Sequence, residues 1–280
     1  MSDELVRMAL EEDIGSGDVT SEYFVPEDAV VDAFMVVRQE GVVSGVRLAE
    51  KVFQEVDATL KTQVLVDDGS RVAKGAMLMR ITGKARSVLT AERTALNFIQ
   101  RLSGVATLTS RYVEAVKHTR AKILDTRKTT PGYRALEKKA VEDGGGLNHR
   151  MGLYDRAMVK DNHLAAEGRL EKLQEAILRV KSERPEVEVE LEADHLGQVV
   201  DFLKLDGVDY ILLDNMSDEE LAKAVEARGE SHRVRLEASG GVNLDTVGEI
   251  SESGVDFISV GALTHSAPAL DIGLDFPDIV

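Results

Sequence analysis

The sequence predicts an α/β protein whose larger part is a parallel sheet with helices on both faces. From residue 121 onward, short apolar runs alternate with helical stretches, and repeated strand–helix units of this size are typical of a parallel sheet buried on both sides. The number of runs favours a β/α barrel, and a doubly wound open sheet is the alternative that periodicity leaves open. The runs cover 121–127, 156–161, 187–192, 209–215, 234–241 and 256–262.

The first 120 residues predict a mixed α/β region. Apolar spacing predicts helices over about 3–12 and 45–56, on either side of a polar loop and a β-branched strand over 29–39. Turn residues at Asp68-Gly69 and Lys74-Gly75 predict strand, turn and strand over 59–83. A long helical region follows over 85–119, and we expect Gly104 to interrupt it.

Composition excludes several classes of protein. The 280 residues carry a net charge of −16, which disfavours general nucleic-acid binding. The absence of cysteine rules out disulfides, thiolate nucleophiles and cysteine-bound metals. The sequence has no long apolar run, and its start is acidic and amphipathic, so we expect a cytosolic protein without a membrane span.

One segment departs from the acidic background by gathering cations between residues 124 and 160. Lys138 and Lys139 fall in a helical stretch with interspersed acids, and we expect both to be solvated. The other cations lie at strand ends or beside glycine-rich loops, where their structural use is small. Such cations converging on one rim would bind a small, highly charged anion. They are Arg127, Lys128, His149, Arg150 and Lys160.

Carboxylates and small residues end the later runs. Glu190 and Asp214 lie on successive strands at equivalent ends, where a carboxylate pair suits Mg²⁺ carrying a polyphosphate, or ribose hydroxyls. Capping of the next helix is the structural alternative for Asp214. The last two runs end in Ser239-Gly240-Gly241 and Gly261-Ala262, which resembles the phosphate site that late strands form in barrels.

Several segments carry a resemblance to a known family. The stretch "LDTRKTTPGYRALEKKAVEDGGGLNHRMGLYDRAMVKDNH" resembles the signature region of the quinolinate phosphoribosyltransferases, and further matches follow in order along nearly the whole chain. They are "EDIGSGDVTSE", "ERTALNFIQRLSGVAT", "VEVELE", "DYILLDN", "LEASGGV" and "ISVGALTHSAPALD".

The resemblance implies a fold, an assembly and a reaction. The expected fold is an N-terminal α/β sandwich domain over 1–105, completed by about 268–280, plus an incomplete, about seven-stranded α/β barrel over 106–267. The expected assembly is a homodimer or larger homo-oligomer. The implied reaction takes quinolinate and phosphoribosyl pyrophosphate to nicotinate mononucleotide, pyrophosphate and CO₂ with Mg²⁺, in NAD biosynthesis.

The resemblance also implies roles by position. Lys128, Glu190 and Asp214 match catalytic positions, with Glu190 and Asp214 near the ribose and Mg²⁺. Arg101 matches an arginine that the neighbouring subunit contributes. The substrate-binding positions for quinolinate match Arg127, His149, Arg150 and Lys160. Those for the 5′-phosphate match Ser239, Gly240 and Gly261. A further substrate-binding position, which varies within the family, matches His265.

Three other functions stay open from the residues. A relative with this fold could act on another pyridine or base. A barrel lyase could use Lys160 as a Schiff-base amine. A binding protein could hold a phosphorylated ligand without turning it over.

Overall fold

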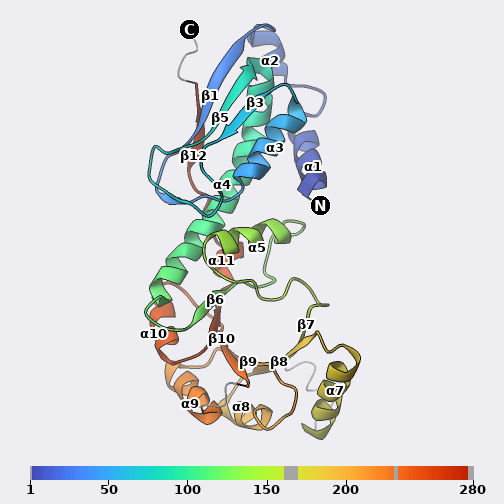
Figure 1. The fold of residues 1–280 in the computed structure, drawn as a ribbon, viewed down its shortest axis with the longest axis vertical. Helices are drawn as coiled ribbons and strands as arrows, with labels where there is room; N and C mark the ends of the chain where they lie inside the picture. The colour runs from blue at the N-terminus through green and yellow to red at the C-terminus, as the bar shows by residue number, and fades with distance from the viewer. Residues whose placement is uncertain (1, 161–169, 230–232, 277–280) are drawn as a thin grey trace. The chain divides into compact units, whose positions relative to one another are not determined.

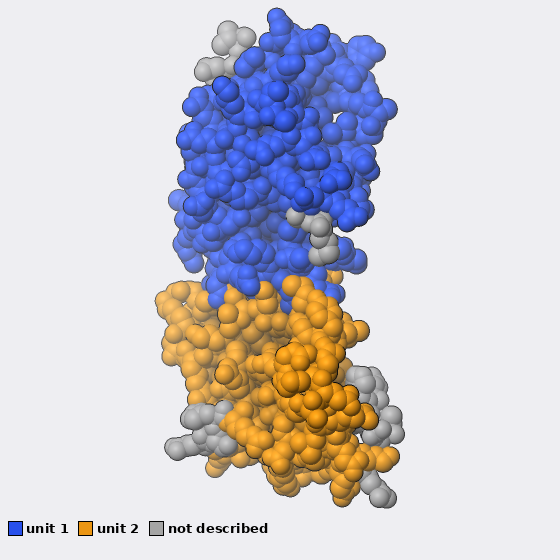
Figure 2. Space-filling model, turned by 45° about the vertical axis from the view of Figure 1, so that its right-hand side comes forward, with its two compact units in different colours: residues 1–110, 130–145, 266–280 blue, residues 111–129, 146–265 orange. Residues whose placement is uncertain are grey.

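The computed structural model describes residues 2–160, 170–229 and 233–276. The chain folds into two compact units, coloured separately in Figure 2. Unit 1 comprises residues 1–110, 130–145 and 266–280, and unit 2 comprises residues 111–129 and 146–265. Unit 1 therefore draws on three separate stretches, and one of them lies within the range expected for the barrel.

Unit 1 is built on a four-stranded antiparallel sheet in the order β12-β1-β5-β3 (Figure 1). These strands are β1 (Val30–Val37), β3 (Lys61–Val64), β5 (Met77–Lys84) and β12 (Ile272–Asp275). Strand β12 pairs with β1, so the end of the described chain completes the first sheet. The short strands β2 (Gly41–Val42) and β4 (Arg71–Val72) form a separate pair.

Helices α1 (Ser2–Ile14), α3 (Val46–Val56) and α4 (Ala85–Val116) pack their apolar faces on this sheet. Helix α3 shows why: Val46, Ala49, Val52 and Phe53 recur at helical spacing and are all buried. Helix α5 (Arg134–Asp143) also contributes to this unit. No helix in the described part of the chain is both long and apolar enough to cross a membrane.

Two expectations for unit 1 were wrong. The polar loop after α1 contains helix α2 (Val19–Phe24), which Asp18 caps by accepting the backbone N–H of Ser21 at 3.0 Å. Gly104 does not interrupt α4. A Cβ on Gly104 would lie 2.1 Å from the carbonyl oxygen of Pro268, so this glycine allows close approach of two segments rather than a helix break.

Unit 2 contains a six-stranded, all-parallel sheet in the order β6-β11-β10-β9-β8-β7. All six predicted runs appear as strands. They are β6 (Lys122–Leu124), β7 (Arg156–Val159), β8 (Glu188–Ala193), β9 (Tyr210–Asp214), β10 (Arg235–Ser239) and β11 (Phe257–Ser259).

The strand order decides between the two architectures left open by the sequence. Strands β7 to β11 follow one another in chain order, and the first strand, β6, pairs beside the last, β11. A doubly wound sheet would instead reverse direction part-way. In the described residues β6 and β7 do not pair, and Leu124 bridges Leu147 instead. The sheet is thus an incomplete barrel.

In the described residues, each of the strands β7 to β11 is followed along the chain by a helix of unit 2 (Figure 1). These helices are α7 (Leu170–Glu183), α8 (Leu196–Phe202), α9 (Asp218–Arg228), α10 (Val247–Glu252) and α11 (Ala262–His265). Asp161, Asn162 and His163, the end of the signature stretch, lie outside the described residues.

Candidate active site

A cavity of about 630 Å³ opens at the carboxyl ends of the parallel strands of unit 2. Barrel enzymes place their chemistry at this end because the loops and strand ends converge there. Its walls carry most of the residues singled out from the sequence. They are Thr126, Arg127, Lys128, His149, Arg150, Met158, Lys160, Glu192, Leu212, Asp214, Asn215, Glu237, Ser239, Gly240, Gly241 and Ser259.

The alternation of side chains along a strand explains which positions reach the cavity. Successive side chains point to opposite faces, so residues two apart share a face. Met158 and Lys160 follow this rule at β7, as do Leu212 and Asp214 at β9. On β10 it holds for Glu237 and Ser239.

The cations form one wall. Arg127 and Lys128 follow β6, and Arg150 is buried, with Nη1 donating to the carbonyl of Arg156 at 3.3 Å. Burial and the nearby charge of Arg127 both lower the pKa of Arg150. Like charges held this close repel each other, and a bound anion would relieve that repulsion. This wall therefore suits a carboxylate or phosphate ligand.

Carboxylates occupy the neighbouring wall. Glu192 is ion-paired with Nζ of Lys160, and both lie at the cavity. Asp214 is half-buried and accepts a hydrogen bond from the side-chain amide of Asn215 at 2.9 Å. Ser217, and not Asp214, caps helix α9 with a capping box, so the structural alternative for Asp214 was wrong.

Beyond Asp214 the wall becomes a backbone cradle. Gly240 has a φ of +96°, and a Cβ there would lie 2.2 Å from Oδ1 of Asn215. Asn215 itself has a φ of +52°. The Ser239-Gly240-Gly241 segment therefore exposes main chain to the cavity, as a phosphate site requires.

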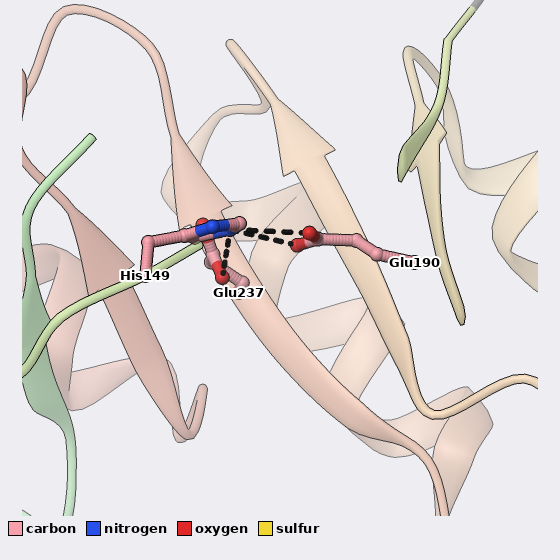
Figure 3. A group of neighbouring side chains, drawn as sticks. All are labelled: His149, Glu190 and Glu237. Carbon is pink, nitrogen blue, oxygen red and sulfur yellow. Dashed lines mark hydrogen bonds and ion pairs between the residues drawn. The ribbon is translucent and has the colours of Figure 1, made fainter. Parts of the chain in front are cut away.

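A buried group consists of His149, Glu190 and Glu237 (Figure 3). Nε2 of His149 is 3.1 Å from Oε2 of Glu190 and 3.3 Å from Oε2 of Glu237, and both carboxylates are fully buried. Burial alone lowers the pKa of His149, but hydrogen bonds to Glu190 and Glu237 outweigh it and raise the pKa to about 9. Burial and the charge of Glu237 raise the pKa of Glu190.

Four predicted residues do not line the cavity. Glu190 is fully buried against His149, whereas Glu192, two residues along the same strand, lines the cavity. Gly261 and the exposed His265 lie beside Lys128, since a Cβ on Gly261 would be 3.1 Å from both side chains. Arg101 belongs to unit 1, where Nη2 donates to Glu137 at 2.7 Å and Nη1 donates to the carbonyl of Ala267 at 2.9 Å.

The sequence reasoning overlooked several residues. Glu192 lies beside Glu190 at the end of the third apolar run but was given no role of its own, although the repeat Glu188, Glu190, Glu192 in β8 predicts a common face. Glu237 was not singled out. Lys138 was expected to be solvated but is 1% exposed, while Lys139 is exposed as expected. Glu137, Lys138 and Val141 are all buried on α5, but nothing in their spacing along the sequence indicates that a lysine is buried there.

Comparison with known proteins assigns the chain to a family. The N-terminal domain model of quinolinate phosphoribosyl transferase matches residues 18–103, and its C-terminal domain model matches residues 105–275. The chain belongs to the quinolinate phosphoribosyltransferase family. It is therefore a phosphoribosyltransferase that contains both domains of that family.

Individual relatives agree with this assignment. A nicotinate-nucleotide pyrophosphorylase [carboxylating] from Mycobacterium leprae is 45% identical over 274 residues, covering 96% of this chain and 95% of that protein. A chloroplastic enzyme of the same name from Arabidopsis thaliana is 42% identical, covering 96% and 81%. The structure of the nicotinate-nucleotide pyrophosphorylase from Francisella tularensis superimposes with a TM-score of 0.90 at 38% identity, covering 98% and 95%.

Proposed function

We propose that the cavity of unit 2 catalyses transfer of phosphoribose from phosphoribosyl pyrophosphate to quinolinate, with loss of CO₂. The products are nicotinate mononucleotide and pyrophosphate. Family membership supports the reaction, and one feature of the cavity supports its location. A wall of cations meets a wall with a carboxylate and a glycine-rich cradle, which matches one substrate with two carboxylates and another with phosphates.

Quinolinate binds at the cation wall in this proposal. Arg127, Arg150 and Lys160 face its two adjacent carboxylates, and His149 supports that wall from below. A Schiff-base lysine is activated by an apolar pocket or a neighbouring cation, whereas Lys160 is ion-paired with the carboxylate of Glu192. This pairing favours the transferase over the barrel lyase.

The sugar donor binds at the neighbouring wall. Ser239 and Gly240 line the cavity and hold the 5′-phosphate. Gly261 and His265 lie beside Lys128 but do not line the cavity, and their role at the phosphate stays a prediction. Asp214 is a half-buried carboxylate at the cavity and has the hard oxygen atoms that Mg²⁺ prefers. Asp214 would hold Mg²⁺, and the metal would neutralise charge on the departing pyrophosphate.

The second carboxylate of this site is Glu192 in our proposal. Glu190 was expected to act as a catalytic residue and metal ligand, but a fully buried carboxylate paired with His149 favours a different role. Glu192 and Asp214 can stabilise positive charge that develops on the ribose as pyrophosphate departs. Once ribosylated, the cationic pyridine nitrogen withdraws electrons and allows the adjacent carboxylate to leave as CO₂. The electron pair of the broken C–C bond stays on the ring carbon, which then takes up a proton from solvent.

The assembly is also part of the proposal. Arg101 is half-buried in unit 1 and held by Glu137, and we expect it to reach the cavity of a neighbouring subunit in a homodimer. A cytosolic location stays a prediction. The proposed reaction depends on neither the homodimer nor the cytosolic location, so it stands even if either of these is wrong.

Product analysis tests the proposed function. Purified full-length protein would be incubated with Mg²⁺ and phosphoribosyl pyrophosphate, and with either quinolinate or nicotinate. The proposal predicts nicotinate mononucleotide and an equal amount of CO₂ from quinolinate, and no product from nicotinate. Product from nicotinate alone would support a relative acting on another base, and binding of the sugar donor without turnover would support a binding protein.

A further inference from the structure

We infer that Glu190 and Glu237 form a carboxylate clamp that positions His149 and Arg150 for the ring substrate. These two glutamates are named the clamp below. The inference rests on the proposed function, because it assigns the cation wall to quinolinate. It concerns residues to which the proposed reaction gives no direct task.

The clamp holds the imidazole from one side. Nε2 of His149 faces Glu190 at 3.1 and 3.3 Å and Glu237 at 3.3 Å (Figure 3). Ser259 donates its hydroxyl hydrogen to the other oxygen of Glu237. Glu190 comes from β8 and Glu237 from β10, so two strands of the rigid sheet fix one ring.

The backbone around His149 is fixed as well. The backbone N–H of His149 donates to the fully buried Asp125 at 2.8 Å, and Nδ1 of the ring accepts the N–H of Arg150 at 2.7 Å. A ring that accepts at Nδ1 carries its proton on Nε2. That N–H faces the clamp, so the ring orientation follows from the geometry.

This arrangement connects the clamp to a substrate-binding residue. Arg150 follows His149 directly in the chain, and its N–H is bonded to the clamped ring. Its guanidinium also contacts the carbonyl of Arg156 and the sulfur of Met158, both at 3.3 Å. Movement of the imidazole would therefore move the main chain that carries Arg150 at the cation wall. Such indirect support is how outer groups orient the residues that touch a ligand.

A metal ion is the other occupant that this cluster suggests. Ligand atoms of His149, Glu190 and Glu237 lie within 4.8 Å of one another, a spacing that a metal could bridge. Arg156 argues against it, because its Nη1 lies 3.7 Å from Oε2 of Glu190 and 3.5 Å from Nε2 of His149. A guanidinium at this distance already balances the carboxylate charge and repels a divalent cation.

Arg156 is itself firmly held. It donates to Glu188 at 2.7 Å, and its guanidinium carbon lies 4.1 Å from the centre of the Tyr210 ring. Tyr210 in turn donates its hydroxyl hydrogen to Glu188 at 3.1 Å. The cation beside the clamp is thus a fixed part of the barrel interior.

A double-mutant cycle tests the clamp. Quinolinate binding to the full-length protein would be measured by calorimetry for wild type, Glu237→Gln, His149→Ala and the double variant. Glu237→Gln removes the charge and keeps the shape, and we expect about a tenfold loss of quinolinate affinity in the wild-type background. In the His149→Ala background the same change should alter affinity by less than about twofold, because the clamp has nothing left to position.

Urea unfolding of the same four proteins supplies a readout that needs no ligand. Glu237→Gln should lower the unfolding midpoint of wild type. It should raise the midpoint in the His149→Ala background, because it removes a buried charge that has lost its partner. This result separates the clamp from the proposed function: a wild-type protein that fails to bind quinolinate overturns the function, while the unfolding cycle still tests the clamp.

Asp256→Asn serves as the matched control. Asp256 pairs with the buried Arg228 and accepts the N–H of Leu236 at 2.9 Å, at the strand ends opposite the cavity. It should cost stability and leave quinolinate affinity unchanged. Equal losses of affinity from Glu237→Gln in both backgrounds would overturn the clamp, as would a stoichiometric divalent metal in the purified protein that Glu237→Gln removes.

Discussion

The two main sheets of the molecule bury different kinds of side chain. The sheet of unit 1 packs against α3 and α4 through apolar side chains such as Met35, Met79 and Phe53. The sheet of unit 2 buries Glu190, Glu192 and Glu237 on its strands, with His149 and Arg156 against them. Apolar burial stabilises a fold directly, whereas a buried charge costs stability unless it is paired.

This difference separates the tasks of the two units. In unit 1 a substitution that leaves a cavity should reduce stability, and in unit 2 a substitution at the cavity wall should reduce binding. Several charges of unit 2 are paired, such as His149 with Glu190 and Lys160 with Glu192, so the barrel tolerates buried charge and can present cations and carboxylates to a ligand. Four substitutions sharpen or break this comparison.

The largest effect is expected from Phe53→Ala in unit 1. Phe53 is fully buried in the core, and its truncation should lower the free energy of unfolding by about 3–5 kcal/mol. Phe24→Ala is the matched control, because Phe24 is 82% exposed and should cost little. Urea unfolding measures both. A similar loss for the two variants would contradict the assignment of stability to this core.

Arg127→Ala should act on binding instead. Removing one charged partner from a hydrogen-bonded ion pair with the substrate should weaken quinolinate binding by about 2–5 kcal/mol, with a smaller effect on phosphoribosyl pyrophosphate. Arg179→Ala, at an exposed position of α7, is the control. Steady-state kinetics with each substrate varied in turn would measure the effect. An unchanged Michaelis constant for quinolinate would remove Arg127 from the dicarboxylate site.

Asp214→Asn should affect the other substrate. The loss of a carboxylate that stabilises developing charge should lower kcat by about 10²-fold or more, with little change in quinolinate affinity. Asp201→Asn on α8 controls for the general loss of a carboxylate in unit 2. A titration with Mg²⁺ should show that the Asp214 variant needs more metal for its half-maximal rate. An unchanged metal requirement would count against Asp214 as the ligand.

The smallest effect is expected from the glycine cradle. A Cβ at Gly240 would collide with Asn215, so Gly240→Ala should weaken binding of the sugar donor by about 1–3 kcal/mol, the usual cost of forcing extra volume into a packed site. At Gly241 nothing lies within 4 Å, and Gly241→Ala should cost only the conformational strain of its φ of +59°. Michaelis constants for the sugar donor would distinguish them. Equal changes in the Michaelis constant for Gly240→Ala and Gly241→Ala would mean that the sugar donor does not require the backbone of Gly240 to come close to Asn215.

The sequence predicted the strands of unit 2 well because a parallel sheet buried on both faces leaves continuous apolar runs. It also predicted which strand ends carry cations, as Arg127 and Lys160 illustrate. It could not separate Glu190 from Glu192, since both fall on one face of β8 and only the depth of the barrel distinguishes them. Lys138 shows a similar limit, because burial on α5 depends on tertiary neighbours that the local pattern does not reveal.

Calorimetric titration of the intact protein with quinolinate and with nicotinate tests the central claim most directly. The claim is that the charges of unit 2 serve to bind two adjacent carboxylates. Loss of one charge-assisted contact should make nicotinate bind about 10²-fold more weakly than quinolinate. Equal affinities for the two ligands, or binding of nicotinate alone, would contradict the account.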